Sequence, residues 1–474
     1  MSSEPLRLDS AQGRWVLTAA VLGSGVVLLD GTVVNVALPA LGRDLDADFA
    51  ALQWTINGYL LSLAALILLG GSLGDRFGRR RLFLVGTVWF GVASLLCGLA
   101  PDVRTLIAAR VLQGVGGALL TPGSLALLQA SFAPSDRGRV IGAWSGLGSV
   151  AAGLGPFLGG LVLELSWRLV FLLNVPLCAA VVVVALRHVP ESRDPDAARS
   201  VDVAGAVLGA LGLAGVTYAL IALGEDGRSG LAAVTGGTGV ALLVAFVLVE
   251  LRVREPLLPP GIFASRQFTS VNLVTFAVYA ALSGFFLLLV VHLQVVAGYS
   301  PLASGVALVP VTVLMATLSS RSGAIAARRG PRLQMTAGPL LMAAAVLLLS
   351  RVGPGAPYAL AVLPGVLLFG IGLVTIVAPL TTSVLAAAPD RHAGLASGVN
   401  NAVARTAGLL AVAVIPVAAG IGGTDYQDPE RFAPGFQTAS YLMAGLLVVG
   451  GLLAAVSVSD DVVGEPVDED APPA

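Results

Sequence analysis

Long apolar runs separated by short polar segments dominate the chain. Each run is close to the roughly 20 residues that an α-helix needs to cross the hydrocarbon core of a bilayer. The connections between the runs are mostly short and rich in Gly, Pro and Arg. The pattern predicts an all-α membrane protein with fourteen transmembrane helices. The predicted spans are residues 15–39, 52–73, 82–100, 106–131, 140–163, 169–187, 203–223, 231–249, 268–292, 302–325, 333–350, 358–385, 394–420 and 438–457.

The composition favours lipid over water as the solvent. Hydrophobic residues make up 56% of the chain and charged residues only 12%, with a mean hydropathy of +0.89, whereas soluble proteins carry about 25% charged residues. The run 15–39 is too long for the apolar core of a signal peptide, so we expect it to remain as a span. Cys97 and Cys178 lie in apolar runs, which favours buried thiols over a disulfide or a metal site. We expect no cofactor and no nucleic-acid partner.

The arginines predict the orientation. With the N-terminus inside, the inside segments hold 19 arginines and the outside loops hold six, and Arg110 and Arg405 complete the 27 basic residues from within spans. Cytoplasmic loops are the ones enriched in basic residues. We therefore expect a multi-pass protein of the cytoplasmic membrane with both termini in the cytoplasm. The acidic tail 458–474 is expected to be disordered.

A weak internal repeat links the two ends of the chain. Gly71, Gly78 and Gly86 recur 252 residues later as Gly323, Gly330 and Gly338, and Arg76 recurs as Arg328. Both copies lie between two predicted spans on the same side, and parallel halves of this kind are typical of transporters. The repeat divides the chain into an N-terminal unit (15–187), an inserted pair of spans (203–249) and a C-terminal unit (268–457).

Two charged side chains lie deep in the predicted spans. Asp30 is about 15 residues, or roughly 22 Å, from the start of the first span, and a carboxylate at that depth has to pair with a cation, face water or carry a proton. Arg110 lies within side-chain reach of the same depth, with Gln113 one turn further along. The alternatives are an Asp30 held by structural hydrogen bonds and an Arg110 whose side chain extends to the outer headgroups.

Further polar side chains are candidates for the wall of a substrate cavity. Arg405 lies well inside the thirteenth span, one turn after Asn401, with no partner evident in the sequence. His292 ends the ninth span, where a proton relay competes with the commoner role of a polar anchor at the interface. Asn35 and Asn57 are the other candidates, together with Asp30 and Gln113.

Residues 71–81 form the most specific stretch of the chain. The sequence Gly-Ser-Leu-Gly-Asp-Arg-Phe-Gly-Arg-Arg-Arg predicts a tight turn between the second and third spans. Glycine permits the positive φ angles that such a turn needs, and Asp75 is placed to meet an arginine or the N-terminal end of a helix. A plain basic loop explains Arg76 and Arg79 but not Asp75 or the spacing of Gly71 and Gly78.

The fifth span carries a face of small residues around one proline. Gly153, Gly155, Pro156, Gly159 and Gly160 allow a neighbouring helix to approach closely. Proline and glycine together also permit a bend. A fixed close-packed interface and a hinge are equally consistent with this pattern.

Together these segments resemble the major facilitator superfamily, and within it the 14-helix drug:proton antiporters. Residues 71–81 match the family's G-x-L-x-D-R-x-G-R-R motif, and residues 106–117 match its R-x-x-Q-G motif. Gly155, Pro156, Gly159 and Gly160 look like its antiporter motif. Residues 29–39 are similar to the first-span motif of the 14-helix branch, and residues 167–176 and 397–405 also fit the family.

The resemblance implies two six-helix bundles around a central cavity, alternating access, and two extra central helices. It also implies that Asp30 and Arg110 couple protonation to substrate release. Asp75 is implied to hold one conformational state by meeting the cytoplasmic end of the thirteenth span. The chain departs from the family pattern in three places: Ala327 stands where a second Asp75 is expected, Ala151 replaces a frequent glycine, and the tenth span contains no acid.

The expected function is proton-coupled export of small hydrophobic or monocationic compounds, such as antibiotics. The expected partners are the substrate, protons and the lipid bilayer, and the expected state is a monomer. A transporter of the same fold that moves a lipid, siderophore or metabolite, or works inward, is the first alternative. A membrane-embedded enzyme or sensor is the second, but the chain offers one deep acid, three histidines and no segment for an extra soluble domain.

Overall fold

The computed structural model describes residues 6–193, 202–225, 229–253, 255–387 and 393–460, and within these ranges it is helical with no β-strand. The helices are α1 (Ala11–Asp44), α2 (Phe49–Phe77), α3 (Arg79–Gly98), α4 (Val103–Ser131), α5 (Pro134–Leu163), α6 (Arg168–Leu172), α7 (Asn174–His188), α8 (Val203–Ala222), α9 (Ser229–Glu250), η1 (Pro260–Ala264), α10 (Arg266–Val295), α11 (Pro301–Ala307), α12 (Val309–Arg329), α13 (Arg332–Leu349), η2 (Tyr358–Val362), α14 (Leu363–Ala386), α15 (Ala393–Ala418), η4 (Asp425–Gln427) and α16 (Pro429–Ser457).

The predicted spans are confirmed. Across the described ranges, fourteen helical segments are long and apolar enough to cross a membrane, and each contains most of one predicted run. Three of them are not single regular α-helices. The sixth consists of α6 and α7, the tenth of α11 and α12, and the twelfth begins with the π-helical turn η2 before α14. A backbone change of this kind is invisible in a hydrophobicity pattern, because every residue across it remains apolar.

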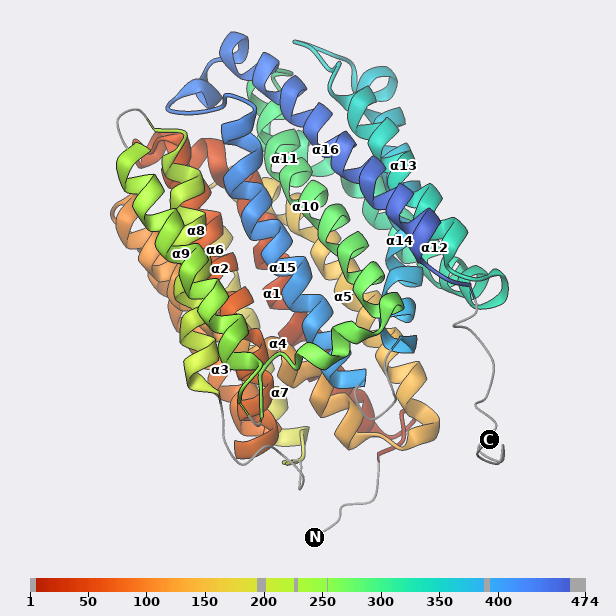
Figure 1. Cartoon of the computed structure of the whole chain (residues 1–474). Coiled ribbons are helices and arrows are strands. Elements are labelled where there is room, and N and C mark those ends of the chain that lie inside the picture. The colour runs from red at the N-terminus through yellow and green to blue at the C-terminus, as the bar shows by residue number, and fades with distance from the viewer. Residues whose placement is uncertain (1–5, 194–201, 226–228, 254, 388–392, 461–474) are drawn as a thin grey trace.

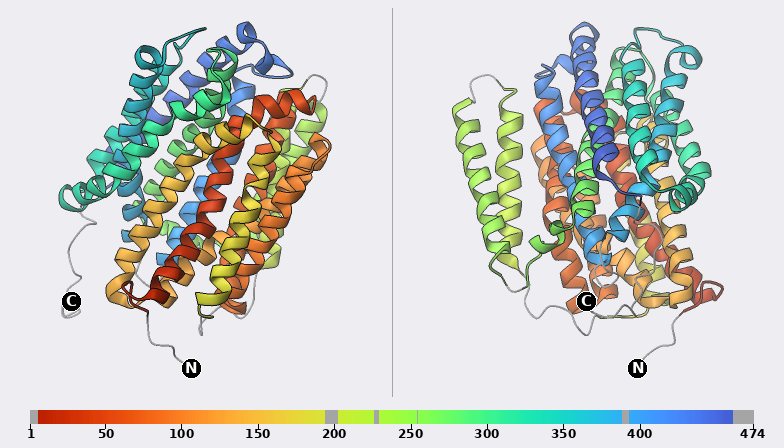
Figure 2. Two further views of the ribbon diagram at one scale, coloured as in Figure 1. Left: turned by 180° about the vertical axis from the view of Figure 1, so that it is seen from behind. Right: turned by 45° about the vertical axis from the view of Figure 1, so that its right-hand side comes forward.

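The helices pack as two groups with a hairpin at the edge (Figure 1). Helices α1–α7 contact mainly one another, and so do α10 and α12–α16, while the short α11 packs chiefly on α5. The hairpin of α8 and α9 is central in the sequence but peripheral in space, as the right-hand view of Figure 2 shows. Helix α8 packs on α2 from one group and on α15 from the other, while α9 is largely exposed to lipid.

The two groups meet at one end of the bundle. We call the end at which α1 begins the terminal face and the other end the opposite face. Contacts between the groups gather toward the opposite face, where the Phe49 amide donates to the Gly423 carbonyl (2.8 Å) and the Tyr426 hydroxyl to the Ala47 carbonyl (2.6 Å). Gln53 Nε2 donates to the Val412 carbonyl at 2.6 Å.

Toward the terminal face the groups separate. On the terminal half of α5, a Cβ added to Gly138, Gly142 or Gly146 would meet nothing within 4 Å. Along α5 the groups therefore lie apart toward the terminal face, whereas α15 still packs on α2 there, since a Cβ on Gly398 would lie 3.2 Å from Leu68. Figure 2 shows the same divergence of the two groups from behind.

The internal repeat is visible in the backbone. Helix α2 ends at Gly78 (φ +118°) and α12 ends at Gly330 (φ +82°), and each glycine leads into the next span. The expected turn over 71–81 is much shorter than predicted, because α2 continues to Phe77 and only Gly78 lies outside a helix. Glycine is needed there because a side chain at such a φ and ψ is strained.

A carboxylate occupies the same place in both copies of the turn. Glu191, after α7, accepts a hydrogen bond from the Arg80 amide at 3.1 Å. Asp460, after α16, accepts one from the Arg332 amide at 3.0 Å. Each acid thereby caps the helix that follows the turn. Its negative charge also interacts favourably with the positive end of the helix dipole.

Candidate functional site

Asp30 lies at the centre of a buried polar cluster. Its side chain is fully buried on α1, and one carboxylate oxygen forms an ion pair with Arg110 Nη1 from α4. The other oxygen accepts hydrogen bonds from Gln113 Nε2 and Asn174 Nδ2, both at 2.8 Å. Two helices, α4 and α7, therefore supply the partners of a single carboxylate on α1, and Asp30 and Arg110 lie together as expected.

Arg110 is held from several sides. Its Nη1 also donates to Gln113 Oε1 (2.5 Å), and its Nε donates to the Thr55 carbonyl (3.0 Å). The guanidinium carbon lies 4.3 Å from the centre of the Tyr59 ring, a cation–π arrangement. The side chain does not extend to the headgroups, because it is 1% exposed and directed toward Asp30. Its charge is compensated inside the protein.

The sequence analysis missed part of this cluster. Asn174 was noted only as part of a motif, and neither Tyr59 nor Ser94 was singled out. Gln113 Nε2 donates to Ser94 Oγ at 2.8 Å, which fixes the orientation of the amide. Asn174 follows the break between α6 and α7 at Leu173. A lone amide within the apolar run 169–187 was the available signal.

Three of the expected cavity residues lie on α2 and α15. Asn57 is fully buried, and neither atom of its amide group has a hydrogen-bond partner. Arg405 is half-buried, with no hydrogen bond or ion pair to any described residue. Asn401 is exposed and donates to the Ser397 carbonyl of its own helix at 3.1 Å. The structure does not bring these residues into the Asp30 cluster, and Asn35 on α1 is half-buried outside it.

His292 lies inside the C-terminal group of helices. Its Nε2 is 2.7 Å from the Val352 carbonyl, and its ring stacks on Phe436 of α16 at 4.0 Å between centroids. None of the partners found for it belongs to the Asp30 cluster. This packing is that of a buried structural side chain rather than an interfacial anchor.

The charges of the first turn pair locally. Asp75 accepts from Arg79 Nε at 2.8 Å, one helical turn away across Gly78, and Arg76 lies 5.2 Å from the Phe77 ring. Asp75 has no recorded contact with α15 in this conformation, within the part of the chain that the structure describes.

The small residues of α5 pack against both groups. A Cβ on Gly155 would lie 2.0 Å from Thr32 Oγ1 of α1, and one on Gly159 would lie 2.8 Å from Val33. A Cβ on Gly160 would lie 2.7 Å from the Pro301 carbonyl oxygen of α11. The predicted close helix approach is confirmed, and Pro156 lies within an uninterrupted α5.

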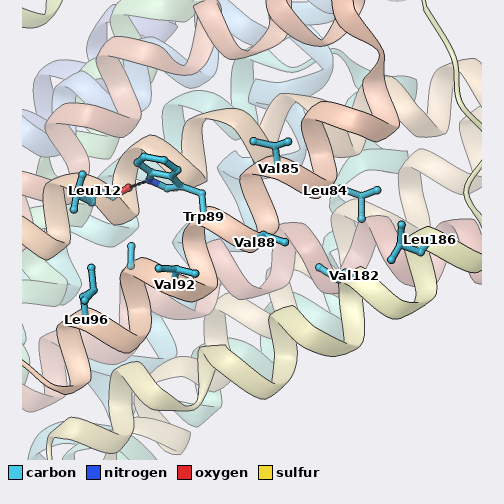
Figure 3. Close-up of a pocket in the computed structure, with 10 residues that line it drawn as sticks. Leu84, Val85, Val88, Trp89, Val92, Leu96, Leu112, Val182 and Leu186 are labelled. Carbon is cyan, nitrogen blue, oxygen red and sulfur yellow. Dashed lines mark hydrogen bonds between the residues drawn. The ribbon is translucent and has the colours of Figure 1, made fainter.

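A separate hollow of about 600 Å³ opens on the outside of the N-terminal group. Apolar side chains of α3, α4 and α7 line it, among them Val88, Trp89 and Leu112 (Figure 3). The Trp89 indole donates to the Leu112 carbonyl at 2.7 Å. The hollow faces lipid and shares no lining residue with the Asp30 cluster.

Comparison with known proteins identifies the family. The family model described as Major Facilitator Superfamily matches residues 20–413, most of the chain. The protein belongs to the major facilitator superfamily. It is therefore a multi-pass transporter rather than an enzyme, as the sequence analysis expected.

Similar members of the major facilitator superfamily are resistance and export proteins. The chain is 36% identical to the puromycin resistance protein of Streptomyces alboniger, over 97% of this chain and 95% of that protein. It is 34% identical to a methylenomycin A resistance protein of Bacillus subtilis (93% and 94% covered) and 36% identical to the tetracenomycin C resistance and export protein of Streptomyces glaucescens (85% and 75%).

Solved structures of the superfamily support the fold. A bacterial homologue of the human lysosomal transporter Spinster, in an inward-facing and unoccupied conformation, matches with a TM-score of 0.66 at 15% identity, over 95% of this chain and 97% of that one. The major facilitator fold is thus common to both chains.

Proposed function

We propose that the protein exports small lipophilic, antibiotic-like compounds from the cell in exchange for protons, by alternating access. The observation that carries the proposal is the buried cluster of Asp30, Arg110, Gln113 and Asn174. A carboxylate at this depth is costly unless it is paired or protonated. The resistance and export proteins among the relatives support the substrate class.

The cluster has the chemistry of a coupling site. Burial disfavours the charged carboxylate of Asp30, while the guanidinium and the two amide donors favour it. Small movements of Arg110 relative to Asp30 shift this balance, so that the carboxylate takes up a proton in one conformation and releases it in another. Moving one charge through 100 mV is worth about 2.3 kcal/mol, which is enough to support a useful substrate gradient.

The moving bodies are proposed to be residues 15–187 and 268–457, with 203–249 as the added pair, and the protein is proposed to act as a monomer. In this scheme the described conformation opens to the cytoplasm through the terminal face. Asp75 is free of α15 in this state and contacts its terminal end in the other. The glycines of α5 lie where the two bodies meet.

Proton coupling is tested in proteoliposomes. A resistance profile in an efflux-deficient host, with puromycin, methylenomycin A and tetracenomycin C, selects the compound to assay. Asp30→Asn is expected to abolish accumulation of that compound driven by a pH gradient, measured per amount of folded protein because the change also leaves Arg110 without its counter-ion. Arg139→Ala, an exposed change at the start of α5, is the matched control. Unchanged coupling of transport to the pH gradient in Asp30→Asn would contradict the proposed mechanism.

The orientation is tested by cysteine labelling. Cys97 and Cys178 are buried, so the background is low. With both termini cytoplasmic, a cysteine at Ser229, the first residue of α9, should react with a membrane-impermeant maleimide in intact cells. A cysteine at the exposed Ser135, on the terminal face, should react only after permeabilisation. The reverse pattern would place the termini outside and turn export into import. The segment 226–228 next to Ser229 and the tail from 461 onward lie outside the described residues.

A further inference from the structure

Arg405 is a cation near the middle of a span, and it has no partner among the described residues. It is the thirteenth residue of α15, about 18 Å along a helix of 26 residues, which places it near the middle of the span. Within the described ranges it forms no hydrogen bond and no ion pair. An arginine at this depth is expected to find an anionic or hydrogen-bonding partner.

Two of the helices that pack against α15 carry tyrosine hydroxyls. Helix α15 packs on α2 and α10, which carry Tyr59 and Tyr279. The Tyr59 hydroxyl already donates to the Val27 carbonyl at 3.2 Å. Tyr279 is half-buried and forms no hydrogen bond with a described residue, so its hydroxyl is available.

The one deep carboxylate of the described structure is already compensated. Asp30 is paired with Arg110 and accepts from Gln113 and Asn174. These three deep charges, Asp30, Arg110 and Arg405, therefore sum to +1. A cationic cargo would add to that charge, whereas an anionic cargo would cancel it.

Arg405 lies where access from the terminal face ends. One turn toward that face, Asn401 is exposed, and Arg405 itself is half-buried. One turn further in, Gly408 packs against α10 and α2, since a Cβ there would lie 2.6 Å from Ser283 Oγ and 4.0 Å from Leu60. Beyond it Gln53 bonds to the Val412 carbonyl. Arg405 is thus the cation at the inner end of the accessible side of α15.

We infer that Arg405 is the substrate-binding cation, and that the exported compounds are lipophilic anions carrying a carboxylate or phenolate group. Guanidinium binds such oxygens through strong charge-assisted hydrogen bonds. When the terminal side closes, Arg405 loses its water, and a bound anion then provides the partner that the protein lacks. The inference rests on the proposed export function and replaces the expectation of a monocationic substrate.

The test compares two dyes of similar ring system and opposite charge. Fluorescein (anionic) and rhodamine 123 (cationic) are titrated with the whole protein in lipid nanodiscs, and binding is followed by fluorescence anisotropy. Wild type should bind fluorescein about tenfold or more tightly than rhodamine 123, because one charge-assisted contact is worth that factor. Arg405→Ala should lower the affinity for fluorescein by a similar factor and leave that for rhodamine 123 unchanged.

Two further variants control the result. Arg405→Lys keeps the charge and should retain part of the preference for fluorescein. Arg321→Ala removes an exposed arginine of α12 and should change neither affinity. The inference is overturned if wild type does not bind fluorescein, if it binds rhodamine 123 equally well, or if Arg405→Ala weakens both dyes alike. Because binding is measured without a pH gradient, this outcome is independent of whether Asp30 couples transport to protons.

Discussion

The two halves of the molecule share a backbone arrangement but differ in how the charged side chains deep in their spans are paired. In the N-terminal half, Asp30 and Arg110 neutralise each other in a fully buried cluster. In the C-terminal half, Arg405 lies near mid-depth without a partner in the described structure. We propose a division of labour in which one half supplies its own counter-ion in this conformation and the other receives one from the cargo.

The frame itself is closely repeated. Gly78 and Gly330 make the same turn, and Glu191 and Asp460 cap the following helices in the same way. The difference between the halves is therefore confined to side chains placed on a common scaffold. Five substitutions test this separation of scaffold from charge.

Removing Arg110 is expected to have the largest effect. Arg110→Ala leaves Asp30 buried with no counter-ion, which typically destabilises a protein by about 3–5 kcal/mol. Thermal unfolding in detergent should show a large fall in Tm, while Arg104→Ala, exposed at the start of the same helix, should show none. An unchanged Tm in Arg110→Ala would mean that the pair contributes nothing to the fold.

The two turn glycines should respond equally. Ala at Gly78 or Gly330 adopts a strained φ and meets the capping acid, with an expected cost of about 1–3 kcal/mol at either site. Gly138→Ala, in open space on α5, serves as the control and should cost nothing. A clear loss of stability in only one of the two variants would show that the turn requires glycine in one half alone.

Asp75→Asn is expected to separate stability from transport. The Asp75–Arg79 pair is partly exposed, so its loss should change stability by less than about 0.5 kcal/mol. Transport should nevertheless fall severalfold, because the residue is proposed to contact α15 in only one of two states. Equal transport in Asp75→Asn and Arg139→Ala would reduce Asp75 to an ordinary surface charge.

Removing Arg405 should have the smallest effect on the fold. Since the structure offers this cation no partner to lose, Arg405→Ala should leave Tm unchanged or raise it. The contrast with Arg110→Ala, measured in the same assay, is the direct test of the comparison between the halves. A fall in Tm as large as that of Arg110→Ala would reveal a structural partner for Arg405.

The sequence predicted the architecture because membrane spans are encoded in a simple pattern. All fourteen runs became helices, since every backbone polar group in lipid has to be satisfied within a helix. The break at Leu173, the separate α11 and the π-helical turn η2 were missed. They depend on local geometry within runs that remain apolar throughout.

The site was predictable only in part. Asp30 and Arg110 stood out because a charge in an apolar run requires a partner. Asn174 and Tyr59 did not, because an amide or a phenol is tolerated in a span without one. His292 was expected near a cavity but is packed against Phe436, since helix depth alone does not say which way a side chain points.

The α8–α9 hairpin has a consequence for the speed of the transport cycle. Near the opposite face, Tyr218 of α8 lies 6.2 Å from the Trp54 ring of α2, and Gly224 packs on Val417 of α15. Opening that face has to shear at least one of these contacts. The hairpin thus acts on the barrier between states as well as on their populations.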